Sequence, residues 1–285
     1  MDYKNCTLCP RQCGVDRTAG ETGFCGCPDV ALVAKTMIHK WEEPVLAGSG
    51  GSGAIFFGGC TLGCKYCQNR AISTQPAGKP MDSAALRKEM EKLIAQGAEN
   101  IDLVTPTHFL PTILPALSPK LPVPVVYNCG GYEKAETIRA LAGLVDIYLP
   151  DMKYADDRLA LQLSGAPDYT QRALSAIREM VDQTGKVTFQ GEKMVRGVIV
   201  RHLILPGQVE NSLKVLDLLG ENFSKDELLV SLMRQYTPMG TLPAPYDRKI
   251  TEEEYDAVLS WMYLNGLRGF TQEADSATDA FIPDF

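Results

Sequence analysis

The chain has 285 residues, of which 45% are hydrophobic and 22% are charged, a balance that excludes disordered, collagenous and coiled-coil proteins. Its net charge of −7 leaves no broad basic surface, so neither nucleic acid nor an anionic membrane is expected as a partner. No apolar run approaches the roughly 20 residues that cross a bilayer, and the first residues lack the apolar core of a signal peptide. We therefore expect a cytoplasmic protein, whose nine cysteines stay reduced and are available for metal binding or redox chemistry.

Residues 1–53 are predicted to form an N-terminal cysteine-rich lobe and a connecting segment. Five cysteines lie within the first 27 residues, among Gly, Pro and Thr and without a hydrophobic period, which predicts an irregular segment held together by ligands. A β-like stretch follows over residues 30–40, and a glycine-rich run over residues 48–53 predicts a loop.

Residues 54–285 are predicted to form a second unit, in which strands alternate with helices and a C-terminal extension follows. Strands are expected over residues 54–59, 101–105, 125–128, 145–149, 196–205 and 228–233. Helices are expected over residues 83–96 (with Asp82 as N-cap), 133–142, 158–163, 170–184, 211–219 and 252–264. Such alternation implies right-handed crossovers and a parallel sheet. The pattern therefore predicts an α/β fold, with a partial or full barrel whose site lies at the carboxyl ends of the strands.

Three cysteines follow the first predicted barrel strand: Cys60, Cys64 and Cys67. A loop this tight can wrap three thiolates around one soft metal centre. Structural zinc and iron–sulfur cubes usually take four protein ligands. The triplet therefore either leaves one coordination position to a non-protein ligand or is completed by another residue, such as His39 or an N-terminal cysteine.

The spacing C-x3-C-x2-C, with Tyr66 just before the last cysteine, resembles the signature of the radical S-adenosylmethionine (SAM) superfamily. The resemblance implies a partial (β/α)6 TIM-like barrel with the site at its top. It implies a [4Fe–4S] cluster on Cys60, Cys64 and Cys67, with SAM bound to the open iron. It also implies an enzyme that reductively cleaves SAM to a 5′-deoxyadenosyl radical, which abstracts a hydrogen atom from a substrate. Reduced flavodoxin or ferredoxin is the implied electron donor.

Further stretches resemble the pyruvate formate-lyase activating enzyme group, in particular relatives with an N-terminal cysteine segment. They cover residues 6–11, 58–69, 104–108, 127–132, 149–154, 200–207 and 231–238. One expectation from this resemblance is an activase that abstracts a glycine hydrogen from a partner enzyme. A radical SAM enzyme acting on a small molecule or peptide is an alternative. A non-catalytic zinc-binding interaction protein is an alternative from another class.

The same resemblance implies a set of cofactor contacts at predicted strand ends: Tyr66, Gln68, Asn69, Thr105, Asn128, Asp151, Lys153 and His202. Lys153 would pair with the methionyl carboxylate of SAM, and Asp151 would help to hold a monovalent cation. The family usually carries a Gly-Gly-Glu element that engages the methionyl amino group, but this chain has Thr105 and Pro106 there. Arg201 and His202 alternate on one strand, so only one of them can face into the barrel.

A second metal site is predicted in the N-terminal lobe. Cys6, Cys9, Cys13 and Cys25 supply four soft ligands, which suit zinc or a second iron–sulfur cluster. Cys27 is one cysteine too many, so the identity of the fourth ligand stays open. The alternative is a set of free thiols in a lobe that is ordered by packing.

Overall fold

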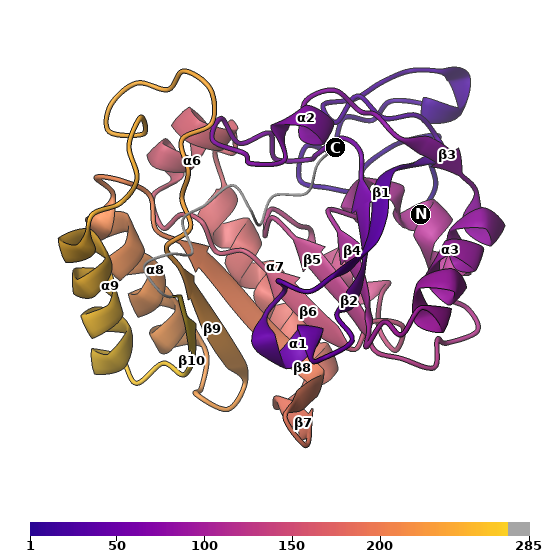
Figure 1. The fold of residues 1–285 in the computed structure, drawn as a ribbon. Helices are drawn as coiled ribbons and strands as arrows, with labels where there is room; N and C mark the ends of the chain where they lie inside the picture. Colours follow the sequence, from indigo (N-terminus) through magenta and orange to yellow (C-terminus); the bar gives the residue numbers. More distant parts are fainter. Residues whose placement is uncertain (273–285) are drawn as a thin grey trace.

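The computed structural model describes residues 1–272, and the last part of the predicted second unit, residues 273–285, lies outside the described residues. One curved sheet forms its centre, as Figure 1 shows. Its strands are β1 (Ala31–His39), β2 (Ser52–Phe57), β3 (Lys79–Met81), β4 (Ile101–Val104), β5 (Val125–Cys129), β6 (Ile147–Pro150), β7 (Thr188–Gln190), β8 (Lys193–Leu203), β9 (Leu228–Met233) and β10 (Gly269–Thr271).

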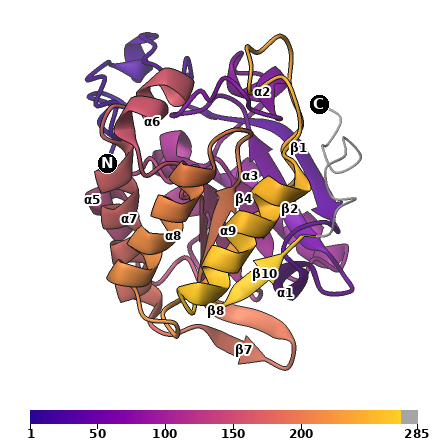
Figure 2. The same ribbon diagram turned by 90° about the vertical axis from the view of Figure 1, so that its left-hand side faces the viewer.

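The helices lie mainly on the outer, convex side of this sheet, where α7, α8 and α9 stand in a row (Figure 2). They are η1 (Arg17–Ala19), α1 (Pro44–Ala47), α2 (Arg70–Ser73), α3 (Ser83–Ala95), η2 (Thr107–Phe109), α4 (Leu110–Ala116), α5 (Ala135–Arg139), α6 (Asp157–Ser164), α7 (Tyr169–Thr184), α8 (Val209–Asn222) and α9 (Glu252–Leu264). None of these described helices is long and apolar enough to cross a membrane.

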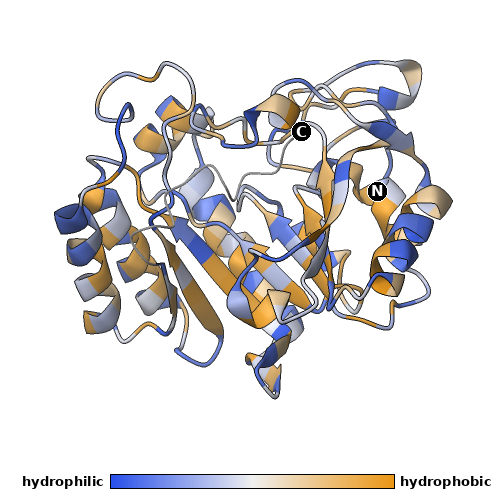
Figure 3. Ribbon diagram, viewed as in Figure 1, coloured by the Kyte–Doolittle hydropathy of each residue, from blue (hydrophilic) through white to orange (hydrophobic). Residues whose placement is uncertain are grey.

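The order of the strands confirms the predicted fold class. The sheet runs β10-β9-β8-β6-β5-β4-β2-β1-β3, and the six predicted barrel strands pair in parallel between β9 and β2. The sheet stays open between β10 and β3 within residues 1–272, so it is a partial barrel and not a closed one. The inner strands are almost fully buried and hydrophobic (Figure 3), as expected of a parallel sheet covered on both faces.

Local sequence signals fix the ends of several helices. The Asp82 carboxylate accepts the backbone N–H of Ala85 at 2.8 Å, which confirms the predicted N-cap of α3. Thr251 and Glu254 form a capping box at the start of α9, each side chain accepting the other's backbone N–H. These caps set the helices that cover the sheet and leave its strand ends free to build a site.

Some elements differ from the predictions. The β-like stretch forms β1, which pairs antiparallel with β2 and brings part of the predicted N-terminal unit into the sheet. The predicted boundary after residue 53 falls inside β2, because Ser52 and Gly53 already pair with β1. Helix α5 begins at Ala135, two residues after the predicted start, since the preceding residues form a tight turn. Helix α4 was not predicted; it contains Pro111 at its first turn and Pro115 within it.

Candidate functional site

A cavity of about 160 Å³ lies at the carboxyl ends of the parallel strands. This is the end of an α/β barrel where active sites are found. The structure brings most of the predicted site residues together around it. The lining includes Cys60, Cys64, Tyr66, Cys67, Gln68, Asn69, Thr105, Asn128, Asp151 and Lys153.

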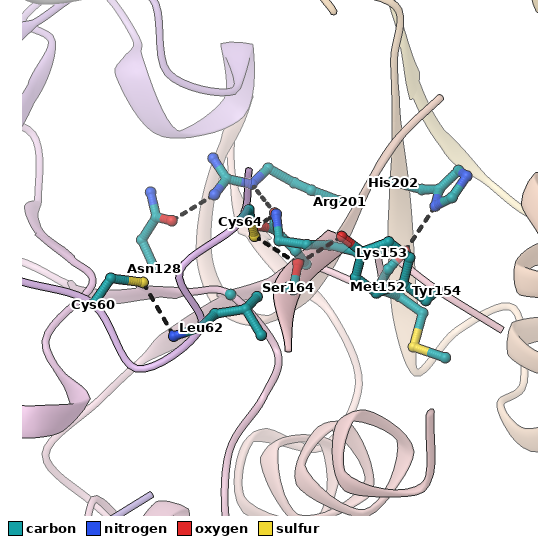
Figure 4. Close-up of polar contacts among 12 residues, drawn as sticks. Cys60, Leu62, Cys64, Asn128, Met152, Lys153, Tyr154, Ser164, Arg201 and His202 are labelled. Atoms are coloured by element: carbon teal, nitrogen blue, oxygen red, sulfur yellow. Dashed lines mark hydrogen bonds and ion pairs between the residues drawn. The ribbon is translucent and has the colours of Figure 1, made fainter. Parts of the chain in front are cut away.

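The three cysteines of the loop after β2 each receive a hydrogen bond at sulfur. The backbone N–H of Leu62 donates to Cys60 at 3.3 Å, and the Ser164 hydroxyl donates to Cys64 at 3.1 Å (Figure 4). The Ser73 hydroxyl donates to Cys67 at 3.5 Å. Burial raises the pKa of Cys60 to about 12, so a thiolate there needs compensating charge. A bound metal supplies it, because a coordinating thiol is deprotonated.

The cysteine loop is held in place by Arg11, which belongs to the N-terminal lobe. Its guanidinium donates to the carbonyls of Thr61 at 3.0 Å and Leu62 at 3.1 Å, both within the loop. The same group donates to the carbonyl of Ser164 at 2.9 Å, at the end of α6. Five donors in a rigid fork suit such a multiple contact. The lobe and the cysteine loop are therefore one connected structure.

The hydroxyl of Tyr66 belongs to a buried chain of hydrogen bonds. It bonds the Tyr154 hydroxyl at 2.7 Å, which in turn bonds the Ser164 hydroxyl at 2.7 Å. Because Ser164 also donates to Cys64, the chain ends on a cysteine sulfur (Figure 4). Tyr66 lines the cavity with its ring, while its polar end supports the cysteine loop from behind.

Charged groups cluster at the ends of β6 and β8. The Lys153 ammonium lies 2.6 Å and the Arg201 guanidinium 3.1 Å from the two oxygens of Asp151. Burial opposes ionisation, but these two cations outweigh it and hold the pKa of Asp151 below its usual value. Arg201 also donates to the Asn128 side chain at 2.5 Å (Figure 4) and pairs with Glu42 at 3.6 Å. This side of the cavity therefore carries two cations, which pair with the carboxylates of Asp151 and Glu42.

The two residues that alternate on β8 separate as expected, and Arg201 is the one that faces the cavity. His202 does not line it. Its Nδ1 lies 2.7 Å from the carbonyl of Met152, the side chain is fully buried, and burial lowers its pKa to about 4 (Figure 4). The structure thus places a neutral His202 behind the cavity wall.

Thr105 ends β4 with φ of +59°, in the left-handed region that a β-branched residue rarely adopts. Its backbone N–H donates to the carbonyl of Asn128 at 2.8 Å, so the strained residue is tied to the next strand. Strain of this kind concentrates at functional sites, where the surrounding structure enforces it.

Glu133 is a cavity residue that the sequence interpretation missed. It follows β5, it is 2% exposed, and its Oε1 accepts the Thr107 hydroxyl at 2.9 Å. Its Oε2 is buried without a hydrogen-bond partner among the described residues. Burial raises its pKa to about 8. The available signal was its position two residues after the strand-end glycines Gly130 and Gly131, but it was interpreted as the first residue of a helix.

The N-terminal cysteines lie in irregular turns beside the barrel. The Arg17 guanidinium lies 3.9 Å from the sulfur of Cys6, and a backbone N–H donates to Cys13 at 3.3 Å. Cys27 is different, because its thiol is fully buried and donates to the carbonyls of Cys25 and Gly58. Across residues 1–272, no three His, Cys, Asp or Glu side chains gather as they would around a single metal ion.

The cavity has features that suit a bound polar cofactor. Three lining atoms are buried without a hydrogen-bond partner in the described part of the chain: Asn69 Oδ1, Glu133 Oε2 and Thr237 Oγ1. Buried polar groups normally have partners, so an unpaired set in one cavity indicates a ligand. Gly131 has φ of +82°, and a side chain there would collide with the Asp151 carbonyl, so this turn can approach the site closely. The three thiols, the charged groups and the unpaired polar atoms fit an iron–sulfur cluster with a polar ligand.

A partial α/β barrel with three cysteines after its first parallel strand defines the class of protein. Comparison with known families agrees, since the model of the Radical SAM superfamily matches residues 54–219, more than half of the chain. The chain belongs to the radical SAM superfamily and is an enzyme of this class. Membership implies a [4Fe–4S] cluster and SAM as cofactors, and it argues against the non-catalytic zinc-binding protein considered above.

Three relatives illustrate the similarity. An uncharacterized protein, MJ0674 of Methanocaldococcus jannaschii, is 30% identical over 269 residues, which cover 90% of this chain and 74% of that protein. A radical SAM methyltransferase from Sphaerobacter thermophilus has a TM-score of 0.54 at 14% identity, covering 78% of this chain and 66% of that structure. Streptococcus suis SuiB, bound to its precursor peptide SuiA, has a TM-score of 0.53 at 13% identity, with coverages of 76% and 47%. The chain thus spans about two thirds and about half of the lengths of these two structures, and their likeness concerns the fold.

Proposed function

We propose that Cys60, Cys64 and Cys67 hold the [4Fe–4S] cluster and that the cavity binds SAM against it. The observation that carries this proposal is the loop itself, in which each sulfur has its own hydrogen-bond donor at the mouth of a cavity with unpaired polar atoms. When bound, the cluster and SAM supply a one-electron cleavage that yields methionine and a 5′-deoxyadenosyl radical, which takes a hydrogen atom from the substrate.

Different residues of the cavity bind different parts of SAM in this proposal. Lys153 and Arg201 line the cavity with two cations and suit the methionyl carboxylate as charge partners. Asn128 and Asp151 orient these two cations from the ends of β5 and β6. A monovalent cation at Asp151 would compete with both, since each oxygen of that carboxylate already faces a cationic side chain.

The ring of Tyr66 and the side chains of Gln68, Asn69 and Thr105 line the rest of the cavity and are proposed as further cofactor contacts. Of these, Asn69 has the unpaired carbonyl oxygen that a donor on the ligand would satisfy. His202 stands behind the wall, so we propose for it a positioning role through Met152.

For the N-terminal lobe we propose a second metal site on Cys6, Cys9, Cys13 and Cys25. Cys27 is left out of this set because its thiol packs against the barrel, where a side chain on Gly59 would lie only 2.2 Å from its sulfur. Four thiolates suit either zinc or a second cluster. Iron and zinc analysis of anaerobically purified protein separates the two, because zinc alone in the lobe leaves about four irons per chain and a second cube adds more.

The finer reaction that we propose is activation of a glycyl-radical enzyme, supported by the resemblance of several strand-end segments to the activating enzymes. Superfamily members generally take electrons from flavodoxin or ferredoxin, and we propose the same donors here. Incubation with SAM, dithionite and a candidate glycyl-radical enzyme should give an electron paramagnetic resonance doublet. Absence of a doublet with every candidate, while 5′-deoxyadenosine still forms, favours a small molecule or peptide as substrate.

The central test replaces Cys60, Cys64 and Cys67 together with alanine. The variant should lose the loop cluster and form no 5′-deoxyadenosine after reduction with dithionite, because no thiolates remain to hold the iron. C27A is the matched control, because it removes a buried thiol that lies outside the cavity. This variant should retain both the loop cluster and the formation of 5′-deoxyadenosine. Retained 5′-deoxyadenosine in the triple variant would refute the proposed function.

A further inference from the structure

The cavity has two electrically different sides. Lys153 and Arg201 place two cations on one side, where they pair with Asp151 and Glu42, and Glu133 lies on another part of the wall, after β5. Within residues 1–272 no Lys, Arg or His forms an ion pair with Glu133; the Thr107 hydroxyl donates to its Oε1, and the Cys129 thiol is a further neighbour of its carboxyl group. A ligand that carries both a carboxylate and an amino group matches such a cavity, and the methionyl end of SAM is such a ligand.

We infer that Glu133 is the acceptor for the amino group of bound SAM, while Lys153 faces its carboxylate; this deepens the proposed function and rests on it. The acceptor atom is Oε2, the oxygen that has no partner in the described chain. The segment after β4 carries Thr105, Pro106 and Thr107, so it offers no acidic side chain to the amino group. The inference therefore assigns the acceptor to the turn after β5.

Neighbouring residues hold Glu133 in one orientation. The Thr107 hydroxyl donates to Oε1 at 2.9 Å and lies 2.8 Å from the Tyr127 hydroxyl, so the partner of this oxygen is buried and is itself held by a second buried side chain. The backbone N–H of Glu133 donates to the carbonyl of Gly131 at 2.9 Å, which fixes the turn as well. One carboxylate oxygen is therefore used to position the side chain, and the other is left for a ligand.

Burial supports a role beyond packing. A carboxyl group at 2% exposure with one unpaired oxygen is costly, and burial raises its pKa to about 8. The N–H bonds of an amino group would satisfy the unpaired oxygen, because an amine donates to a carboxyl oxygen in either of its protonation states. The geometry needs no rearrangement of Thr107 or Tyr127 for that contact.

The experiment measures equilibrium binding of three ligands to the cluster-loaded protein under anaerobic conditions: SAM, a SAM analogue that lacks the amino group, and a decarboxylated analogue that keeps it. E133A should weaken SAM and the decarboxylated analogue about 10- to 100-fold, the range of a hydrogen bond to a charged group. It should change binding of the deaminated analogue by less than about threefold, because that ligand offers no donor to lose. K153M should give the mirror pattern, weakening the two ligands that carry a carboxylate.

The outcomes separate this inference from the proposed function. Wild-type protein with a full cluster that binds no SAM refutes the proposed function. If the wild-type protein binds SAM but E133A weakens all three ligands equally, or weakens none of them, the assignment of Glu133 is overturned and the proposed function is not. Iron content and melting temperature are measured on every variant. Should E133A lose its cluster, the near-isosteric E133Q decides by the same ligand pattern, with a smaller loss of about 3- to 10-fold expected because one oxygen acceptor remains.

Discussion

The two cysteine groups of this enzyme differ in what holds them. The loop after β2 is fixed by elements distant in sequence, since Ser164 of α6 donates to Cys64 and Arg11 of the lobe binds the loop carbonyls. The lobe cysteines lie on turns with short-range hydrogen bonds, such as those between Cys6 and Gly14 or Val15. The cysteine loop is therefore preorganised by the barrel, whereas the lobe depends on its own ligands and on a few anchors.

Two arginines, the half-buried Arg11 and the buried Arg17, are the main polar anchors of the lobe. Arg11 reaches the cysteine loop, and its guanidinium stacks on Phe24 at 3.8 Å. Arg17 is 2% exposed and donates to the carbonyls of His108 at 2.6 Å and Pro28 at 2.9 Å. Arg11 thus joins the lobe to the cluster loop, and the following predictions compare what holds the lobe with what holds the loop.

The largest expected difference concerns the lobe cysteines. Replacing Cys6, Cys9, Cys13 and Cys25 with serine should remove the metal of the lobe while the loop cluster and 5′-deoxyadenosine formation remain, because the loop is held mainly by the barrel. Metal analysis and product quantification on the same preparation check this. Loss of all iron together with the product would show that the two groups are one functional unit, and unchanged metal content would show that the lobe binds none.

The next effect concerns Arg17. R17M removes a buried cation whose N–H groups satisfy two carbonyls, so the free energy of unfolding should fall by about 3 kcal/mol. For a chain of this size the melting temperature should then fall by about 5–10 °C.

R139M is the control for this change. It breaks a surface pair with Glu179, in which the arginine side chain is 63% exposed, and should cost less than about 0.5 kcal/mol. Equal shifts in the two variants would contradict the role of Arg17 as the anchor of the lobe. Both are compared by thermal unfolding of protein with matched metal content.

Much of the fold could be predicted from the sequence because its signals are local. Apolar runs such as Ala54 to Phe57, the Asp82 cap and the tight cysteine loop each lie within a few residues. The strand ends therefore also indicated Asp151 and Lys153 correctly as neighbours of the cysteine loop around one cavity. The sequence did not indicate pairings that depend on the rest of the sheet, such as the antiparallel placement of β1 beside β2.

The site was harder to predict because its contacts join distant segments. Arg201 meets Asn128 across 73 residues, and Tyr66 meets Tyr154 across 88, and neither pairing leaves a local pattern. Glu133 looks like an ordinary first-turn helix residue until the Thr107 hydroxyl is placed beside it. His202, in contrast, was predicted as a cofactor contact but does not line the cavity. Two polar residues in a row on a strand face opposite sides, and the sequence does not indicate which of the two faces the cavity.

The smallest predicted effect tests whether the barrel tunes the loop cluster electronically as well as holding it. Hydrogen bonds to cluster sulfurs favour the more negative, reduced state and so raise the reduction potential. S164A removes the 3.1 Å donor to Cys64 and should lower the potential by about 20–60 mV, the equivalent of one hydrogen bond for one electron. Redox titration followed by electron paramagnetic resonance measures it.

S73A is the matched variant for this test, because Ser73 donates to Cys67 over the longer distance of 3.5 Å. A hydrogen bond at that length is weaker, so its removal should lower the potential by clearly less than S164A does. If S164A and S73A lower the potential by the same amount, the chain of hydroxyl groups through Tyr154 does not strengthen the hydrogen bond from Ser164 to Cys64. A larger shift in S164A agrees with the shorter distance and with the buried chain from Tyr66 to Cys64, in which linked hydrogen bonds at low dielectric strengthen the last donor.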